Sequence, residues 1–105
     1  MRKCVVAKKS AMTTHRVHIY YSGRVQGVGF RHTAEAIAHK VGVQGFVKNL
    51  QDRRVEVVCE SSKDKIDAYL AEIQQSDLGK YILKADCRWE EPTGNFTDFT
   101  VEFNY

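Results

Sequence analysis

The chain has 105 residues, of which 43% are hydrophobic and 28% charged, and its formal net charge is +3. This length suits one domain, and no apolar run is long enough for a membrane span or a signal peptide, so we expect a cytoplasmic protein with no membrane partner. Cys4, Cys59 and Cys87 are odd in number and widely spaced, which argues against disulfides and a zinc site; Cys59 and Cys87 fall in strand patterns and should be buried, inert thiols.

The positive charge lies in the first half of the chain. Residues 1–16 carry five basic and no acidic side chains. Residues 17–54 carry six basic and two acidic side chains, and residues 55–105 carry five basic and eleven acidic side chains. A positive half of this kind would attract a small anion. Because the sequence has no extended basic stripe, we expect no nucleic-acid partner.

The first 15 residues show neither a strand period nor a helix period, so we expect a disordered tail at 1–15 and one domain at 16–105. Val17, Ile19 and Tyr21 then alternate with more polar residues, which predicts a strand with one buried face. The period changes after a glycine-containing loop, and an apolar stripe predicts a helix that ends at Gly42. The residues of this stripe are Phe30, Ala34, Ile37, Ala38 and Val41.

Five more elements are predicted along the rest of the chain. Residues 43–50 and 54–60 are two closely spaced strands, which indicates a hairpin. A second helix begins after Ser61 as its N-cap and ends between residues 76 and 79. A fourth strand covers residues 81–90, and a short fifth strand follows a turn. The apolar stripe of the second helix consists of Ile66, Tyr69, Leu70 and Ile73, and the inward face of the fifth strand consists of Phe99, Val101 and Phe103.

This order indicates an α+β sandwich with two helices on one face of a mainly antiparallel sheet. The helical crossover makes the first two strands parallel. If the third strand lies between them, their carboxyl ends meet at the same edge of the sheet, about 10 Å apart. The glycine loop follows one of these ends and Asn49 lies at the other, so a phosphoryl group and one attacking water would fit between them.

The loop at residues 22–32 is the best candidate for a binding site. Gly23, Gly27 and Gly29 allow positive φ and can turn several N–H groups toward one point. Arg31 lies in the first turn of the helix, where the helix dipole repels a positive charge and a bound anion would offset this repulsion. Taken alone, the glycine spacing favours a tight turn with a solvated Arg31, and Asn49 considered without the arginine motif is better explained as a turn residue that closes the hairpin. The loop is neither a Walker A sequence nor a dinucleotide fingerprint.

Four segments, at residues 23–31, 45–49, 55–58 and 89–94, resemble the signature segments of the acylphosphatase family. The resemblance covers residues 16–105 and implies a ferredoxin-like βαββαβ sandwich that hydrolyses carboxyl phosphate mixed anhydrides without a metal. It also implies that Asn49 positions the attacking water. Arg53 follows Asp52 where the family often has glycine. The phosphate-binding residues that the resemblance implies are Gln26, Gly27, Val28, Gly29, Phe30 and Arg31.

We therefore expect a monomeric acid anhydride hydrolase with no metal and no cofactor, whose partners are a small-molecule acyl phosphate and inorganic phosphate as product inhibitor. The chemistry agrees, because a carboxylate leaves readily and catalysis needs mainly positioning and charge stabilisation. An RNA-recognition domain shares the topology, but residues 54–60 offer no aromatic side chain for stacking on bases. A non-catalytic regulatory domain that binds a small ligand remains the other alternative, because a fold does not determine a function.

Other titratable residues are weaker candidates. His32, next to Arg31, could contact an anion, but a partly exposed residue at the start of the helix is the favoured interpretation. His18 and His39 lack the spacing of metal ligands. Glu90 and Glu91 are adjacent in a strand, so their side chains should point to opposite faces and cannot converge on one substrate atom.

Overall fold

The computed structural model describes residues 14–103, so Cys4 and nearly all of the predicted tail lie outside the described residues. The chain runs through β1 (His15–Gly23), α2 (Phe30–Val41), β2 (Gln44–Asn49) and β3 (Val55–Ser61). It continues through α3 (Lys63–Gln75), a short 3-10 helix η1 (Asp77–Tyr81), β4 (Ile82–Glu90) and β5 (Phe99–Glu102). β1 starts at His15, two residues before the predicted strand pattern begins at Val17 and at the last residue of the predicted tail, because His15 already pairs with Ser61 of β3.

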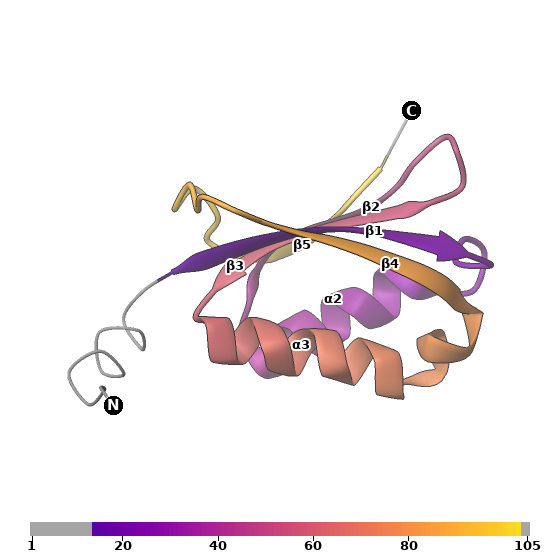
Figure 1. The fold of residues 1–105 in the computed structure, drawn as a ribbon, viewed down its shortest axis with the longest axis horizontal. Helices are drawn as coiled ribbons and strands as arrows, with labels where there is room; N and C mark the ends of the chain where they lie inside the picture. The colour runs from indigo at the N-terminus through magenta and orange to yellow at the C-terminus, as the bar shows by residue number, and fades with distance from the viewer. Residues whose placement is uncertain (1–13, 104–105) are drawn as a thin grey trace.

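Residues 14–103 form one five-stranded sheet in the order β4-β1-β3-β2-β5. β3 is antiparallel to both β1 and β2, so these two strands are parallel to each other, and β5 pairs with β2 in parallel. Both helices lie on the same face of the sheet (Figure 1). The predicted ferredoxin-like α+β sandwich is confirmed, including the position of the third strand between the first two.

The core fills the space between the sheet and the two helices. The alternating residues of β1, namely Val17, Ile19 and Tyr21, are buried there, as the period of two predicts. Tyr69 of α3 is fully buried, and its hydroxyl donates a hydrogen bond of 3.1 Å to the carbonyl of Ala34 in α2. This bond satisfies the buried hydroxyl and links the two helices. The buried residues of the helices are Phe30, Ala34, Ile37 and Ala38 in α2, and Ile66, Tyr69 and Ile73 in α3.

Three sequence-based expectations are wrong in detail. Ser61 is the last residue of β3, and the N-cap of α3 is Ser62, whose hydroxyl accepts a hydrogen bond of 3.3 Å from the N–H of Lys65. Phe103 lies beyond the end of β5 and is 59% exposed rather than buried. Cys87 is exposed because β4 is an edge strand, whereas Cys59, in the central strand β3, is buried as expected.

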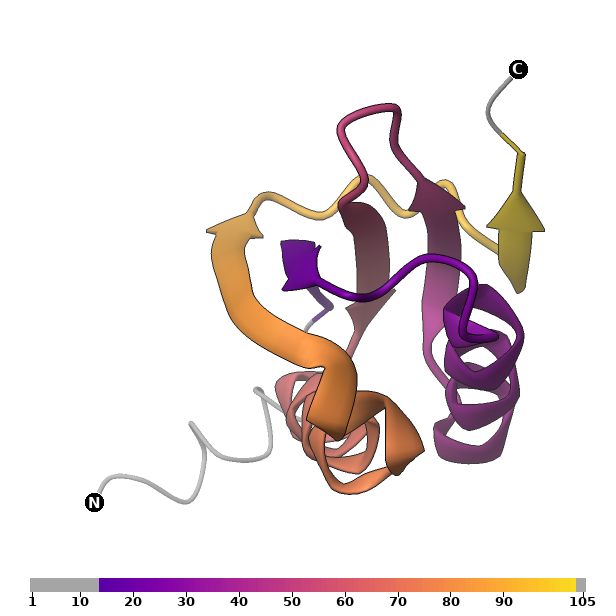
Figure 2. The same cartoon turned by 90° about the vertical axis from the view of Figure 1, so that its right-hand side faces the viewer.

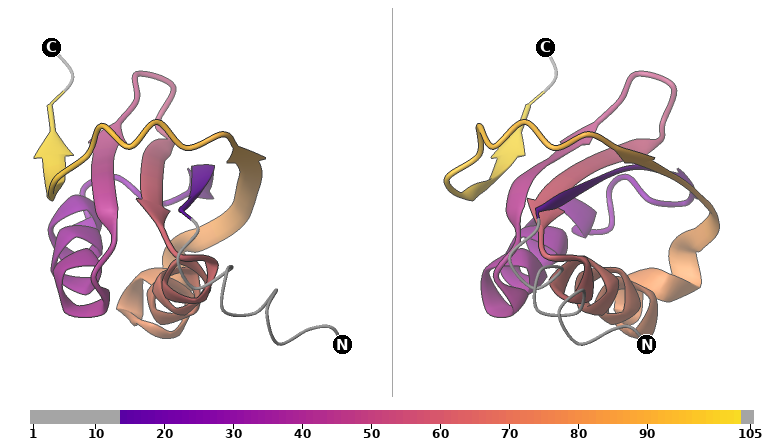
Figure 3. Two further views of the ribbon diagram at one scale, coloured as in Figure 1. Left: turned by 90° about the vertical axis from the view of Figure 1, so that its left-hand side faces the viewer. Right: turned by 60° about the vertical axis from the view of Figure 1, so that its left-hand side comes forward.

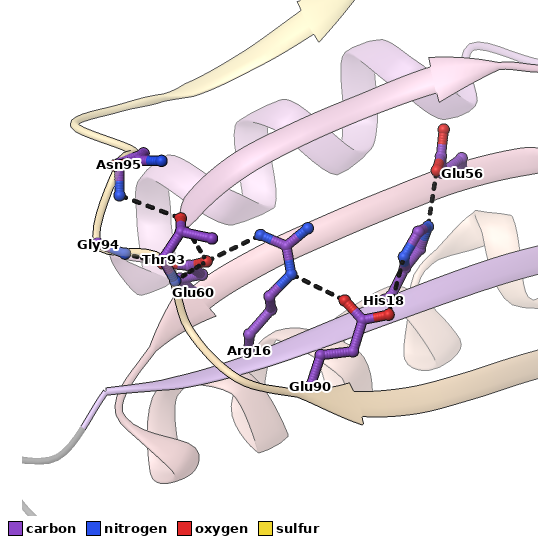
Figure 4. A network of polar contacts seen from close by, with 8 residues as sticks. All are labelled: Arg16, His18, Glu56, Glu60, Glu90, Thr93, Gly94 and Asn95. Atoms are coloured by element: carbon purple, nitrogen blue, oxygen red, sulfur yellow. Dashed lines mark hydrogen bonds and ion pairs between the residues drawn. The ribbon is translucent and has the colours of Figure 1, made fainter.

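The segment that joins β4 to β5 must cross from one edge of the sheet to the other, and Figure 3 shows this crossing. The carboxylate of Glu60 holds the segment, because it accepts hydrogen bonds from the N–H and hydroxyl of Thr93 and from the N–H of Gly94. Arg16 Nη1 donates to the same carboxylate at 2.9 Å (Figure 4). These contacts fix the path that carries β5 to its place beside β2.

Candidate active site

The candidate site lies where β1 and β2 end. Tyr21 of β1 and Asn49 of β2 both pair with Val55 of β3, one on each side. The two strand ends are therefore level with each other and two strand spacings apart, which is about 10 Å. Figure 2 looks at this end of the molecule and shows the loop that leaves β1 for the start of α2 below the β2–β3 hairpin.

The glycine loop has the conformation that its composition predicts. Gly27 and Gly29 have φ values of 78° and 79°, which L side chains rarely adopt. Gly29 is the N-cap of α2, no side chain accepts a hydrogen bond at this cap, and the first turn contains no acidic residue. The N–H groups of the first turn are thus left for an anion at the positive end of the helix dipole.

The side chain of Gln26 connects this loop to the hairpin. Its Nε2 donates hydrogen bonds of 2.8 Å to the carbonyl of Leu50 and 2.9 Å to the carbonyl of Arg54. These two carbonyls flank the hairpin turn directly after Asn49, so the loop and the hairpin form one unit. Since the side chain is committed to the hairpin, a phosphate contact of Gln26 would come from its backbone N–H.

A hollow of about 410 Å³ brings the predicted residues of the loop and the hairpin together. Arg31 and Asn49 both line it, together with Gly27, Gly29 and Phe30. A second hollow of about 450 Å³ also contains Arg31 and Asn49 and adds Gln26 to the lining. Val28 lines neither hollow and packs against the core instead.

The geometry is that of an anion site with a neighbouring polar amide, and comparison with known proteins decides the family. The acylphosphatase family profile matches residues 17–101. The chain belongs to the acylphosphatase family. An acylphosphatase from a Synechococcus species is 48% identical over 79 residues, which cover 75% of this chain and 84% of that protein. One from a Roseiflexus species is 39% identical over 90 residues, which cover 86% of this chain and 97% of that protein.

Solved structures of acylphosphatase-like domains agree with this membership. The crystal structure of acylphosphatase from Bacillus subtilis superposes with a TM-score of 0.78 at 25% identity, covering 84% of this chain and 98% of that one. Full-length HypF in its phosphate- and nucleotide-bound form superposes equally well, with a TM-score of 0.78 at 27% identity. That match covers 86% of this chain but only 12% of HypF, so the shared unit is a small part of a longer protein.

Five residues that the sequence analysis did not assign to the site also line the first hollow, namely Val25, His32, Glu35, Val101 and Phe103. Glu35 lies four residues after Arg31 in α2, so the helical period could have placed both on one face. Val101 and Phe103 come from β5 and the residue after it, and the Phe103 ring lies 5.0 Å from the guanidinium carbon of Arg31. No local sequence signal predicts this last contact, because it depends on β5 crossing to the edge beside β2.

The hairpin turn after Asn49 differs from the Asp-Gly turn that is common in the family. Arg53 adopts φ of 77°, and it is the one residue other than glycine with positive φ within residues 14–103. Asp52 stabilises the turn, because its carboxylate accepts hydrogen bonds from the backbone N–H of Arg54 at 3.1 Å and from the Arg54 Nε at 2.8 Å. These bonds, the backbone one first, lower the pKa of Asp52 below its ordinary value.

Of the other titratable candidates, His32 is exposed and lines the first hollow next to Arg31, whereas His18 and His39 line neither of the two hollows. His18 lies between two carboxylates, with Nε2 2.6 Å from Glu56 and Nδ1 3.3 Å from Glu90. Burial raises the pKa of the Cys59 thiol to about 12, which agrees with the inert role expected for it.

Among the described residues, no group of three or more histidine, cysteine or acidic side chains is arranged to hold a metal ion. None of the described helices is both long and apolar enough to cross a membrane.

Proposed function

We propose that this chain is an acylphosphatase that hydrolyses small acyl phosphates to a carboxylate and inorganic phosphate without a metal. One observation carries the proposal: Arg31 and Asn49 line the same hollow as Gly27 and Gly29. Membership of the acylphosphatase family supports the reaction class.

In this proposal, the phosphoryl group is held by the guanidinium of Arg31 and by N–H groups of the glycine loop. Guanidinium and N–H donors form short, strong hydrogen bonds to phosphate oxygens, and they are fixed in place before the reaction begins. Their positive charge offsets the charge of the phosphoryl oxygens in the transition state. The residues assigned to this cradle are Gln26, Gly27, Val28, Gly29, Phe30 and Arg31.

Asn49 is proposed to orient the attacking water. Its side-chain amide is neutral, so it can bind water without repelling the anionic substrate, as an aspartate would. The water oxygen forms a bond to phosphorus while the bond between phosphorus and the acyl oxygen breaks, and the carboxylate leaves with that electron pair. A phosphate oxygen of the substrate takes the proton of the water, so the reaction requires no separate general base.

The assigned residues all come from one chain, so we propose a monomer as the active unit. Inorganic phosphate, the product, should bind the same cradle and inhibit competitively. The test is hydrolysis of benzoyl phosphate by the purified protein with EDTA present. Hydrolysis that persists in EDTA and is inhibited competitively by phosphate supports the mechanism, and complete loss on chelation with recovery on adding metal contradicts it.

A further inference from the structure

The second hollow extends from the phosphate cradle along the hairpin, and its hairpin side is positively charged. Arg31, Phe103 and the hairpin residues Asn49, Gln51 and Arg53 are among the residues that line it. Arg53 also borders a third hollow of about 270 Å³, which Arg24 lines as well. Two exposed arginines thus lie on the hairpin side of the candidate phosphate site.

The first hollow, which extends from the phosphate cradle toward α2 and β5, has a different lining. It is lined by Val101 of β5 and by Glu35 and His32 of α2, while Phe103 borders both hollows. An acyl group that extends from the cradle therefore meets Arg53 along the hairpin, or Glu35 and Val101 along α2 and β5. The two directions favour acyl groups of different charge.

Arg53 keeps its side chain at a position where glycine would be less strained. Its φ of 77° lies in the left-handed region, which a glycine adopts freely. The acidic neighbour Asp52 pairs with Arg54 at 2.8 Å instead. Within residues 14–103, no hydrogen bond or ion pair engages the Arg53 guanidinium, so this side chain does not stabilise the turn. A strained residue with an unpaired charge beside a candidate site suggests a role in binding.

We propose that Arg53 makes the enzyme selective for acyl phosphates whose acyl group carries a second anionic group. This inference rests on the proposed function, because it places the phosphoryl group at Arg31 and the glycine loop. The acyl group then extends past Asn49 into the second hollow, where its anionic end meets Arg53.

The experiment compares benzoyl phosphate with 4-carboxybenzoyl phosphate, which differs from it by one carboxylate. The measured quantity is the ratio of kcat/KM for the charged substrate to kcat/KM for the uncharged one. Arg53→Gly should lower this ratio by about 3- to 5-fold, the size expected for one solvent-exposed ion pair. Arg53→Lys should keep most of the ratio, because it keeps the charge, and added salt should lower the wild-type ratio toward that of Arg53→Gly.

Arg88→Gly is the matched control. Arg88 lies on the edge strand β4 with its side chain 66% exposed, and its removal changes the net charge of the protein by the same amount. A ratio unchanged in Arg88→Gly and lowered in Arg53→Gly supports the proposal. Equal ratios in wild type and Arg53→Gly would overturn the proposal. A higher ratio in Glu35→Gln than in wild type, together with no change in Arg53→Gly, would also overturn it. Failure of wild type to hydrolyse either substrate would instead overturn the proposed function.

Discussion

At the scale of single residues, substitutions of Arg31 and of Asn49 should have different effects on kcat and on inhibition by phosphate. If Arg31 binds phosphate both before and during the reaction, Arg31→Ala should lower kcat and weaken phosphate inhibition together. Arg31→Lys should rescue little, because the planar fork of the guanidinium is lost. Asn49→Ala should cut kcat by roughly 10²-fold while phosphate inhibition stays near wild type, because a residue that orients only water acts after binding.

Two measurements on each variant, kcat and the inhibition constant of inorganic phosphate, separate these roles. An Asn49→Ala protein that loses phosphate affinity but keeps kcat would assign Asn49 to the phosphate cradle and refute the water-positioning role. The relative placement of the two residues supports the design of this test, since Arg31 of α2 and Asn49 of β2 line the same hollow.

The Gln26 side chain offers a second residue-scale prediction. Gln26→Ala removes both hydrogen bonds from the loop to the hairpin that follows Asn49. Each such bond contributes about 1 kcal/mol, so the hairpin should become less well positioned, and kcat should fall by about 10-fold with little change in phosphate inhibition. Gln74→Ala, an exposed position in α3, is the control and should match wild type. If Gln26→Ala changed phosphate inhibition alone, its side chain would belong to the cradle.

At the scale of elements, the left-handed backbone conformation of Arg53 destabilises the hairpin turn, and substitution by glycine should remove this strain. A non-glycine residue in the left-handed region costs roughly 1–2 kcal/mol, which Arg53 incurs at φ of 77°. Part of the gain from glycine is offset by its greater freedom in the unfolded chain, so Arg53→Gly should stabilise the protein by about 0.5–1 kcal/mol and raise Tm by a few degrees. Arg54→Gly should lower Tm instead, because Arg54 pairs with Asp52 and lies over the Tyr20 ring. A thermal melt in which Arg53→Gly is less stable than wild type would contradict this reading of the turn.

The elements themselves follow from local patterns, whereas the errors concern features that depend on the assembled sheet. The alternation of Val17, Ile19 and Tyr21 is enough to predict β1 and its buried face. The exposure of Cys87 is not predictable in this way, because a strand pattern does not say which strand forms the edge of the sheet. Phe103 continues the alternation of β5 but lies past its end and is 59% exposed.

The candidate site likewise has features that the sequence predicts and features that depend on the assembled structure. The meeting of Arg31 and Asn49 follows from the strand order, because parallel strands on either side of β3 end at one edge. The bonds from Gln26 to the hairpin carbonyls cannot be read from the sequence, since they depend on side-chain direction and on the path of a loop. A glutamine in a glycine-rich loop has no periodic partner that would reveal them.

At the scale of the whole molecule, the path of the chain from β4 to β5 depends on one buried carboxylate. Glu60 is 3% exposed and accepts hydrogen bonds from Arg16, Thr93 and Gly94. Burial by itself would raise the pKa of Glu60, but these hydrogen bonds outweigh burial and hold the pKa below its ordinary value of 4.5. Glu60 lies near the end of β3 opposite to Val55, so it acts on the crossing segment and not on the candidate site.

Stability should therefore depend on pH through Glu60, with a definite sign. A carboxyl whose folded-state pKa is depressed stabilises the protein fully above its unfolded-state pKa, and this contribution is lost as pH falls through the folded-state value. Glu60→Gln should lower the stability by about 2 kcal/mol at pH 7, since an amide cannot accept all of these bonds and brings an N–H₂ group against their donors. The difference in Tm between wild type and Glu60→Gln should narrow steadily below about pH 4.5, the unfolded-state pKa. Glu91→Gln, an exposed neighbour of the same charge, should match wild type throughout. A Tm difference that stays constant from pH 7 to pH 3 would show that the Glu60 carboxylate charge does not hold the crossing segment.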